Sequence, residues 1–92
     1  MYFTVLVSRR DGGPARLGLA ISKKQVRRAV DRNRLKRLAR EVFRHHRAEL
    51  AGNDLVVMAR SAAVAADSVR LSESLVRHIR RLVSASNVQL SS

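Results

Sequence analysis

The middle of the chain reads RNRLKRLAREVFR over Arg32–Arg44, and the spacing of apolar and basic residues in this stretch decides the fold. At about 100° per residue, the apolar residues fall on one side of a helix. That side carries Leu35, Leu38, Ala39, Val42 and His46, with Phe43 and Leu50 at its border. The opposite side carries Asn33, Lys36, Arg37, Arg40, Arg44 and Arg47, while Arg32 and Arg34 fall near the edges of the apolar stripe. We therefore expect a helix that packs through one face and presents a row of cations on the other.

The helical pattern extends from about Val26 to Leu50. Ser22 and Gln25, just before it, have the spacing of a capping box, which is a weak start signal. Gly52-Asn53 is typical of the residues that follow a helix end.

Two β-rich runs precede this helix. Tyr2–Val7 and Arg16–Ser22 are separated by the strong turn signal Asp11-Gly12-Gly13-Pro14, so we predict an antiparallel hairpin. The second run alternates, with Leu17, Leu19 and Ile21 on one face and Gly18, Ala20 and Ser22 on the other. The small-residue face would allow a helix or a ligand backbone to approach the sheet closely.

A further strand and a last helix complete the predicted fold. Asp54–Arg60 contains the unbroken apolar run Leu55–Ala59, which is typical of a strand covered on both faces. Ser61–Ala66 is a connection of small residues, and Asp67 is a reasonable N-cap. The last helix places Leu71, Leu75, Ile79 and Leu82 on one side. We expect one α+β domain over residues 1–84, in which a small sheet packs against the long basic helix and a C-terminal helix, followed by a frayed tail at residues 85–92.

The composition limits the class of protein. The chain has 92 residues, 46% of them hydrophobic and only 3% aromatic, so its core must consist mainly of Leu, Val and Ile. It has no cysteine, which excludes disulfides and thiolate metal sites. No apolar run approaches the roughly 20 residues of a membrane helix, and the basic residues do not precede an apolar stretch as in a signal peptide. We expect a soluble cytoplasmic protein.

Charge indicates the partner. The formal net charge is +12, and between Lys23 and Arg47 eleven Lys and Arg face two acids, a net of +9. So concentrated a charge favours a nucleic-acid ligand. Arginine grips phosphate with two parallel hydrogen bonds, and the Asn33 amide could contact a base edge or a 2′-hydroxyl.

The order of these residues resembles a known family. The segments LGLAISKK (17–24), RRAV (27–30) and RNRLKRL (32–38), followed by Arg40-Glu41 and Phe43-Arg44, are similar to the bacterial ribonuclease P protein subunit. The hallmark is Arg-Asn-Arg followed by an apolar residue and Lys-Arg. The similarity continues through Leu55–Ala59 into the last helix, although family members also have an N-terminal helix and a short strand before the position of Tyr2.

The resemblance implies a ribosomal-protein-S5-domain-2-like fold, in which the basic helix joins two parallel strands by a left-handed βαβ crossover. Physical rules alone favour a right-handed one. It also implies an endoribonuclease subunit that binds a catalytic RNA and the 5′ leader of precursor tRNA while the leader is removed. The metal-assisted hydrolysis, with Mg²⁺, would take place on the RNA, so the chain itself would have no catalytic residue and no metal or other cofactor. Its partners would be the catalytic RNA and precursor tRNA, with no membrane and no small-molecule substrate.

The resemblance also implies site residues. The catalytic RNA would contact Arg28, Arg32, Asn33, Arg34, Lys36, Arg37, Arg40 and Arg44. A groove between the basic helix and the sheet would hold the leader, and it would be lined by Tyr2, Phe3 and Val5 with Lys23 and Lys24. On spacing alone, Tyr2 and Phe3 could equally belong to the core, because adjacent strand residues face opposite ways.

Other interpretations of the basic helix are weaker. An ordinary solvated face mixes charges of both signs, and a helix that lies on a membrane usually carries large apolar residues for insertion. A general nucleic-acid-binding module of ribosomal or chromosomal type is the alternative that charge alone supports. A helix-turn-helix would need a second helix a tight turn before Val26. His45 and His46 point in different directions on a helix, and no carboxylate cluster accompanies them or His78, so we expect structural roles.

Overall fold

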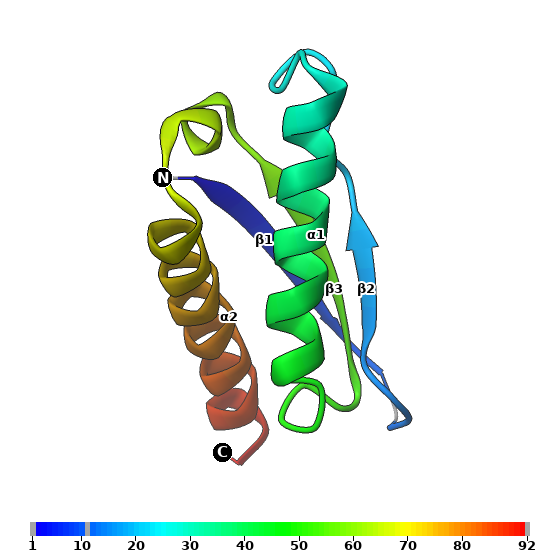
Figure 1. Cartoon of the computed structure of the whole chain (residues 1–92). Coiled ribbons are helices and arrows are strands. Elements are labelled where there is room, and N and C mark those ends of the chain that lie inside the picture. The colour runs from blue at the N-terminus through cyan, green and yellow to red at the C-terminus, as the bar shows by residue number, and fades with distance from the viewer. Residues whose placement is uncertain (1, 11, 92) are drawn as a thin grey trace.

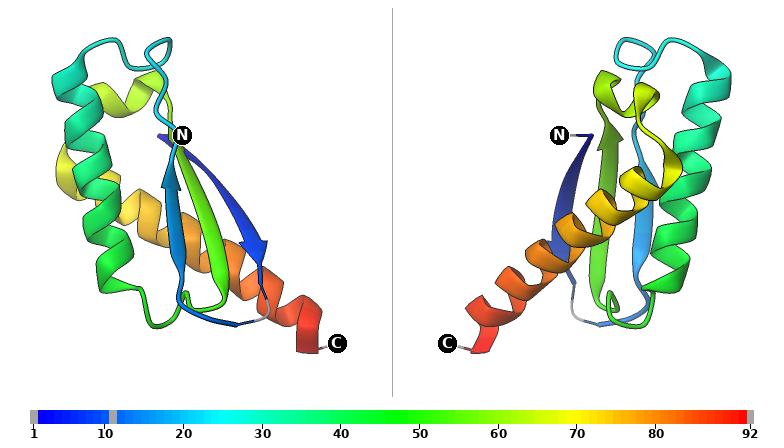
Figure 2. Two further views of the ribbon diagram at one scale, coloured as in Figure 1. Left: turned by 90° about the vertical axis from the view of Figure 1, so that its right-hand side faces the viewer. Right: turned by 60° about the vertical axis from the view of Figure 1, so that its left-hand side comes forward.

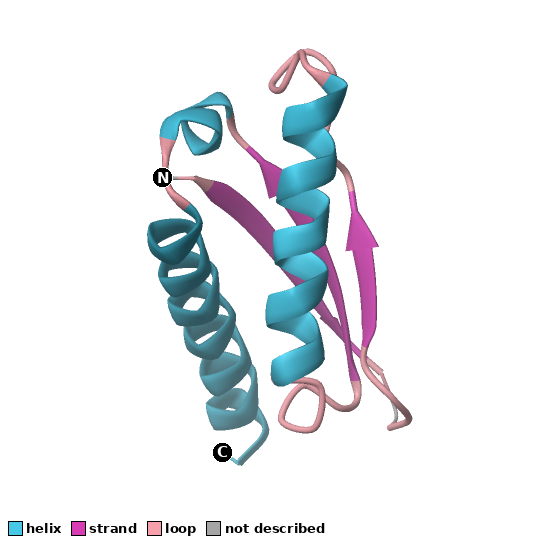
Figure 3. Ribbon diagram, in the orientation of Figure 1, coloured by secondary structure: helices cyan, strands magenta, loops and turns pink. Residues whose placement is uncertain are grey.

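The structure is a computed structural model that describes residues 2–10 and 12–91, with side chains as far as Ser84. Its helices and strands are shown in Figures 1 and 3. In chain order they are β1 (Phe3–Arg9), β2 (Arg16–Leu19), α1 (Ala29–His45), β3 (Asn53–Ala59), the 3₁₀ helix η1 (Ser61–Ala65) and α2 (Ser68–Ser91). The α+β class is as expected from the sequence.

The predicted hairpin of β1 and β2 is wrong, because β3 lies between them. The strand order is β1-β3-β2, with β1 antiparallel and β2 parallel to β3. The turn between β1 and β2 instead spans the start of β3, where the Arg10 N–H donates to the Gly52 carbonyl and the Gly52 N–H donates to the Gly13 carbonyl, both at 2.8 Å. Gly12 and Gly13 have φ of +98° and +92°, which glycine adopts without strain. The apolar β3 thereby gains a partner strand on each side.

The connection from β2 through α1 to β3 is left-handed. In Figure 1 both helices face the viewer, β2 and β3 both point upward, and β3 lies to the left of β2. This is the crossover that the family resemblance implied. Physical rules would favour the right-handed alternative.

The core lies between the sheet and the two helices, which cover the same sheet face (Figure 2). The predicted apolar arc is confirmed within α1, where the buried residues are Leu35, Leu38, Ala39, Val42 and Phe43. His46, which was assigned to the same arc, follows the helix and is half-buried. The largest side chains that are fully buried include Phe3, Leu35, Leu50, Leu55, Leu71 and Leu75. Each such leucine contributes roughly 1.5–3 kcal/mol relative to an exposed position. This packing fixes which face of α1 points to solvent.

Helix α1 is shorter than expected at both ends. The Gln25 N–H donates to the Ser22 hydroxyl at 3.2 Å and the Val26 N–H donates to the Ser22 carbonyl at 3.0 Å. The capping-box pair thus closes a single isolated turn, and Arg28 is extended (φ −82°, ψ 133°) before α1 begins. At the other end, residues 46–52 form turns, and Gly52 adopts a φ of +83°.

Helix α2 begins as predicted. The Asp67 carboxylate accepts a hydrogen bond from the Arg70 N–H at 2.8 Å, which caps the helix. The side chains of residues 85–91 and all of residue 92 lie outside the part of the chain that the structure describes, so the expectation of a frayed tail at 85–92 stays a prediction. In the described residues no helix combines the length and the apolar character needed to cross a membrane.

Candidate nucleic-acid interface

The solvent-facing side of α1 carries the predicted row of polar and basic residues. Asn33, Arg37, Arg40 and Arg44 are exposed and Lys36 is half-buried. Arg37 and Arg40 have no hydrogen bond or ion pair with any residue that the structure describes. A guanidinium in this state keeps its full set of donors for an external anion.

The acid on this face, Glu41, is neutralised by its neighbours. Its carboxylate lies 2.5 Å from the Arg44 guanidinium and 3.1 Å from the His45 ring. The hydrogen bond from Arg44, aided by the charges of Arg44 and His45, lowers the pKa of Glu41 below its usual value. These side chains are all more than half exposed, so the ion pair is weak and Arg44 can exchange Glu41 for another anion.

A groove of about 570 Å³ runs between α1 and β2. Its rim consists of three cations of α1, Lys36, Arg40 and Arg44, and of Arg47 in the turn that follows the helix. Its floor consists of Ala15, Leu17, Leu19 and Phe43. We call it the α1–β2 groove. Because β2 is an edge strand, one side of its backbone has no partner strand among the described residues.

A second group of cations precedes α1. Lys23, Lys24, Arg27 and Arg28 are all exposed on the segment between β2 and α1, which we call the cationic loop (residues 22–28). The cationic loop leads directly into α1, so its four cations precede those of the helix in the chain.

Arg32 and Arg34 differ from the other predicted contacts because both are half-buried and bonded within the chain. Arg32 Nη1 donates to the Val26 carbonyl at 3.0 Å and to the Arg27 carbonyl at 2.7 Å. Arg34 Nη2 donates to the Ala66 carbonyl at 2.6 Å. The sequence pattern placed these two arginines at the edges of the apolar stripe but did not indicate their partners.

Two residues of the predicted leader groove belong to the core. Phe3 and Val5 are only 1% and 5% exposed and point from β1 toward the helices, so they cannot line an open groove. Tyr2 is half-buried against the core, whereas Lys23 and Lys24 are exposed. The physical reason is strand alternation, which sends Thr4 and Leu6 to the opposite face of the sheet.

That opposite face is open in the described part of the chain (Figure 2). Leu6 is 56% and Val56 is 37% exposed, and the register places Leu6, Val56 and Gly18 side by side. The expectation that β3 is covered on both faces is therefore wrong for the described residues. The sequence signal for this face is the small-residue side of the second β-rich run, with Gly18 in β2 and Ala20 just after it.

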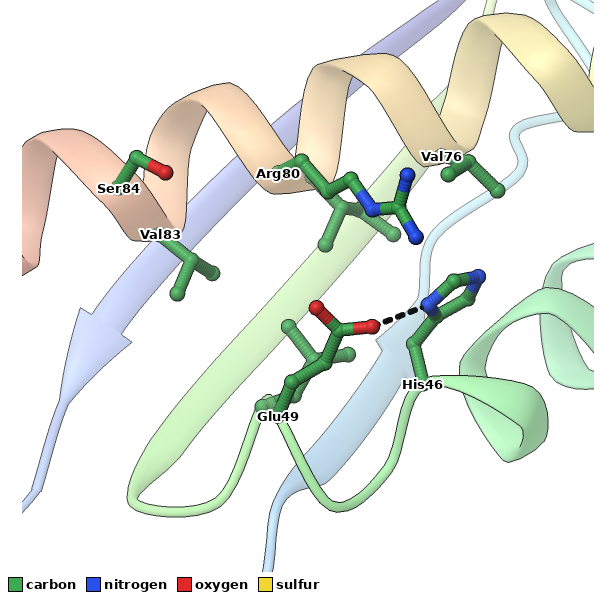
Figure 4. Close-up of a pocket in the computed structure, with 8 residues that line it drawn as sticks. His46, Glu49, Val76, Arg80, Val83 and Ser84 are labelled. Atoms are coloured by element: carbon green, nitrogen blue, oxygen red, sulfur yellow. Dashed lines mark hydrogen bonds and ion pairs between the residues drawn. The ribbon is translucent and has the colours of Figure 1, made fainter.

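The histidines make local contacts. His46 Nδ1 lies 2.5 Å from the Glu49 carboxylate, and Figure 4 shows this pair facing Arg80 of α2 across a pocket of about 250 Å³. The hydrogen bond from His46, followed by the charges of His46 and Arg80, lowers the pKa of Glu49. Among the described residues, no three His, Cys, Asp or Glu side chains gather as a metal site would require.

Comparison with known families places this surface in context. A family model described as Ribonuclease P matches residues 1–83. The chain belongs to the ribonuclease P protein family.

Two curated relatives are named ribonuclease P protein component. The one from Thioalkalivibrio sulfidiphilus is 59% identical over 80 residues, which are 87% of this chain and 67% of the relative. The one from Methylococcus capsulatus is 49% identical over 77 residues, which are 84% of this chain and 60% of the relative. The chain thus spans about two thirds or less of the length of these ribonuclease P proteins.

Solved ribonuclease P proteins share the fold. The protein from Thermotoga maritima, solved in complex with 1-(4-fluorophenyl)-2-thiourea, aligns with a TM-score of 0.78 and 32% identity over 87% of this chain and 78% of that one. The protein from Staphylococcus aureus aligns with a TM-score of 0.71 and 30% identity over 88% of this chain and 73% of that one.

Proposed function

We propose that this ribonuclease P protein binds the catalytic RNA of ribonuclease P and assists endonucleolytic removal of the 5′ leader from precursor tRNA. The observation that carries the proposal is the exposed row of Asn33, Arg37, Arg40 and Arg44 on α1, in a chain of this family. The apolar arc packs against the sheet, so the cations keep a fixed orientation toward the RNA.

The chemistry of this surface suits RNA phosphates. Each Lys or Arg that pairs with a phosphate displaces condensed counterions, and the displaced ions favour binding entropically. The planar fork of arginine adds geometric selectivity. Catalytic RNA would lie along α1, with phosphates on Arg37 and Arg40 and a further strand of backbone in the α1–β2 groove, where Lys36 and Arg47 stand on the rim. Asn33 supplies an amide that could recognise a 2′-hydroxyl.

The leader is assigned to a different face from the one expected at first. Phe3 and Val5 are buried, whereas the open sheet face exposes Leu6 and Val56 beside Gly18. An open apolar face that includes a glycine suits a single strand of RNA that is bound without sequence preference. Lys23 and Lys24 follow β2 at one end of this face, where they would hold leader phosphates.

The protein would supply no reacting group. Its described residues offer no cluster of His, Cys, Asp or Glu for a metal ion. Magnesium held by the RNA would activate the attacking water. The residues of the chain would position the two RNAs and neutralise their phosphates.

A cleavage assay tests the proposal. Precursor tRNA and bacterial ribonuclease P RNA are combined at low magnesium, with and without the protein. We expect the protein to lower the magnesium concentration or the substrate concentration needed for cleavage. The matched control is the Arg37→Ala/Arg40→Ala variant, which should assist less. The proposal is refuted if the wild-type protein lowers neither the magnesium concentration nor the substrate concentration needed for cleavage.

The alternative, a general nucleic-acid-binding module, rests on the net charge of +12. Competition separates the two functions. At about 0.15 M salt, where long-range attraction is screened, a ribonuclease P subunit should prefer folded ribonuclease P RNA over duplex DNA of equal length. A general module should bind both alike.

A further inference from the structure

We infer that Arg32 and Arg34 are positioning residues, which hold the cationic loop and the turn before α2 in place, and that Arg32 strengthens RNA binding through the loop cations. The effect of Arg32 on RNA binding rests on the proposed function. The hydrogen bonds by which Arg32 and Arg34 hold these segments, which we call the tether, do not depend on that function.

The cationic loop needs an internal tether. It carries Lys23, Lys24, Arg27 and Arg28 within six residues, and like charges so close repel one another. The α1 hydrogen-bond ladder reaches only the last residue of the loop, because the Arg32 N–H donates to the Arg28 carbonyl at 3.0 Å. Arg28 itself is extended, and Val26 and Arg27 precede the helix. Arg32 supplies the hold, because one Nη1 group bridges the adjacent Val26 and Arg27 carbonyls at 3.0 and 2.7 Å. Val26 itself is fully buried, which anchors this point of the loop to the core.

The loop is tied to a second segment as well. The Gln25 side-chain carbonyl accepts a hydrogen bond from the Ser61 N–H at 3.1 Å, at the start of η1. Arg34 donates at 2.6 Å to the carbonyl of Ala66, the residue whose N–H caps the end of η1 by donating to the Ala63 carbonyl. The contacts therefore form a closed ring from the loop to η1, from η1 to α1, and from α1 back to the loop.

The arginines of α1 are of two kinds, those that take part in this ring of contacts and those that do not. Arg32 and Arg34 are directed to backbone carbonyls of the protein before any RNA arrives. Arg37, one turn further along α1, is exposed and has no polar partner among the described residues. Arg37→Ala thus removes the same charge as Arg32→Ala but leaves the tether intact, and it serves as the matched control.

Amide hydrogen exchange of the RNA-free protein tests the tether. Arg32→Ala should speed exchange in residues 22–28 about tenfold, the effect of losing roughly one net charge-assisted hydrogen bond. Arg34→Ala should do the same in residues 61–67. Arg32→Lys should restore part of the protection, because an ammonium can also donate to both carbonyls. Arg37→Ala should change neither segment. Unchanged exchange in both Arg32→Ala and Arg34→Ala would overturn the inference.

A double-mutant cycle tests the consequence for RNA. Affinity for bacterial ribonuclease P RNA is measured for Arg32→Ala alone, and in a variant whose loop cations Lys23, Lys24, Arg27 and Arg28 are all alanine. If Arg32 acts through the loop, its substitution should lose most of its effect in that background. Fully additive effects would show direct phosphate contact and would overturn the positioning role. Failure of the wild-type protein to bind the RNA would refute the proposed function instead, and the exchange experiment would still decide the tether.

Discussion

At the scale of single residues, the cations of α1 are unequal. Arg40 is exposed and free of polar partners in the described chain, whereas Arg44 is paired with Glu41 at 2.5 Å. An arginine that must leave an ion pair to bind phosphate gains less than one that is free. We therefore expect Arg40 to contribute more than Arg44 to the affinity for RNA.

We predict that Arg40→Ala weakens binding of ribonuclease P RNA by about 1.5–3 kcal/mol, the usual contribution of a hydrogen bond to a charged group. It should also reduce the slope of log affinity against log salt by about 0.7–0.9. Arg44→Ala should have a smaller effect on affinity. Fluorescence anisotropy across a salt series measures both quantities. Arg81→Ala on α2 is the control, and a loss as large as that of Arg40→Ala would mean that only overall charge matters.

A second residue-scale prediction concerns acid. Hydrogen bonding from His46 lowers the pKa of Glu49 below its usual 4.5 in the folded protein. The folded state therefore binds this proton less readily than the unfolded state, and the contribution to stability is present above about pH 4.5. It is lost as pH falls through the lowered pKa. Denaturant titrations across this range should show a shallower acid loss for Glu49→Gln than for the wild type. Because the Glu49 side chain is 53% exposed, added salt should diminish the difference. If the stability of Glu49→Gln and of the wild type depended on pH in the same way, the contribution assigned to the Glu49–His46 pair would be contradicted.

At the scale of elements, the periodicity of the sequence predicted the features that depend on neighbouring residues, such as which side of a helix is buried. The buried arc of α1 was predicted correctly, because side chains three and four residues apart share a helix face whatever surrounds them. The β1–β2 hairpin was not, because pairing depends on a competitor far along the chain. The strand that contains Leu55–Ala59 occupies the central position of the sheet. The hydrogen bonds of Gly52 with Arg10 and Gly13, at the start of this strand, cannot be predicted from residue spacing.

The same distinction holds for the candidate site. Exposure of Asn33, Arg37 and Arg40 follows from the helical wheel alone. The bond from Arg34 to Ala66 joins positions 32 residues apart, so no local pattern could indicate it. The residues of the site that sequence reasoning misplaced, Phe3 and Val5, depend on which side of β1 the helices cover.

The buried arc gives an element-scale prediction. Leu35 is 0% exposed between α1 and the core, and Leu35→Ala should lower the free energy of unfolding by about 2–5 kcal/mol through lost contacts and a cavity. Val30 on the same helix is 68% exposed, so Val30→Ala should change stability by less than about 0.5 kcal/mol. Urea denaturation monitored by circular dichroism compares the two. Equal losses would mean that α1 does not pack through the arc that contains Leu35.

At the scale of the whole molecule, the charge that serves binding opposes folding. The net charge is +12 and most of it lies on the cationic loop and α1, so the folded chain holds mutually repelling groups close together. Anions that bind there should stabilise the fold by linkage, since they bind the folded surface better than the unfolded chain. Inorganic phosphate, which arginine grips with two bonds, should act more strongly than chloride at equal ionic strength.

This conflict makes a prediction that separates function from stability. A variant with Arg37→Ala, Arg40→Ala and Arg44→Ala should unfold at a higher temperature than the wild type in low salt, because the net charge falls by three from +12. The same variant should bind ribonuclease P RNA less tightly. The extra stabilisation by phosphate over chloride should shrink in the same variant. Thermal denaturation in the two salts, combined with RNA binding, gives all three values. If the variant is instead less stable in low salt, these arginines support the fold, and the surface of α1 is not reserved for an external anion.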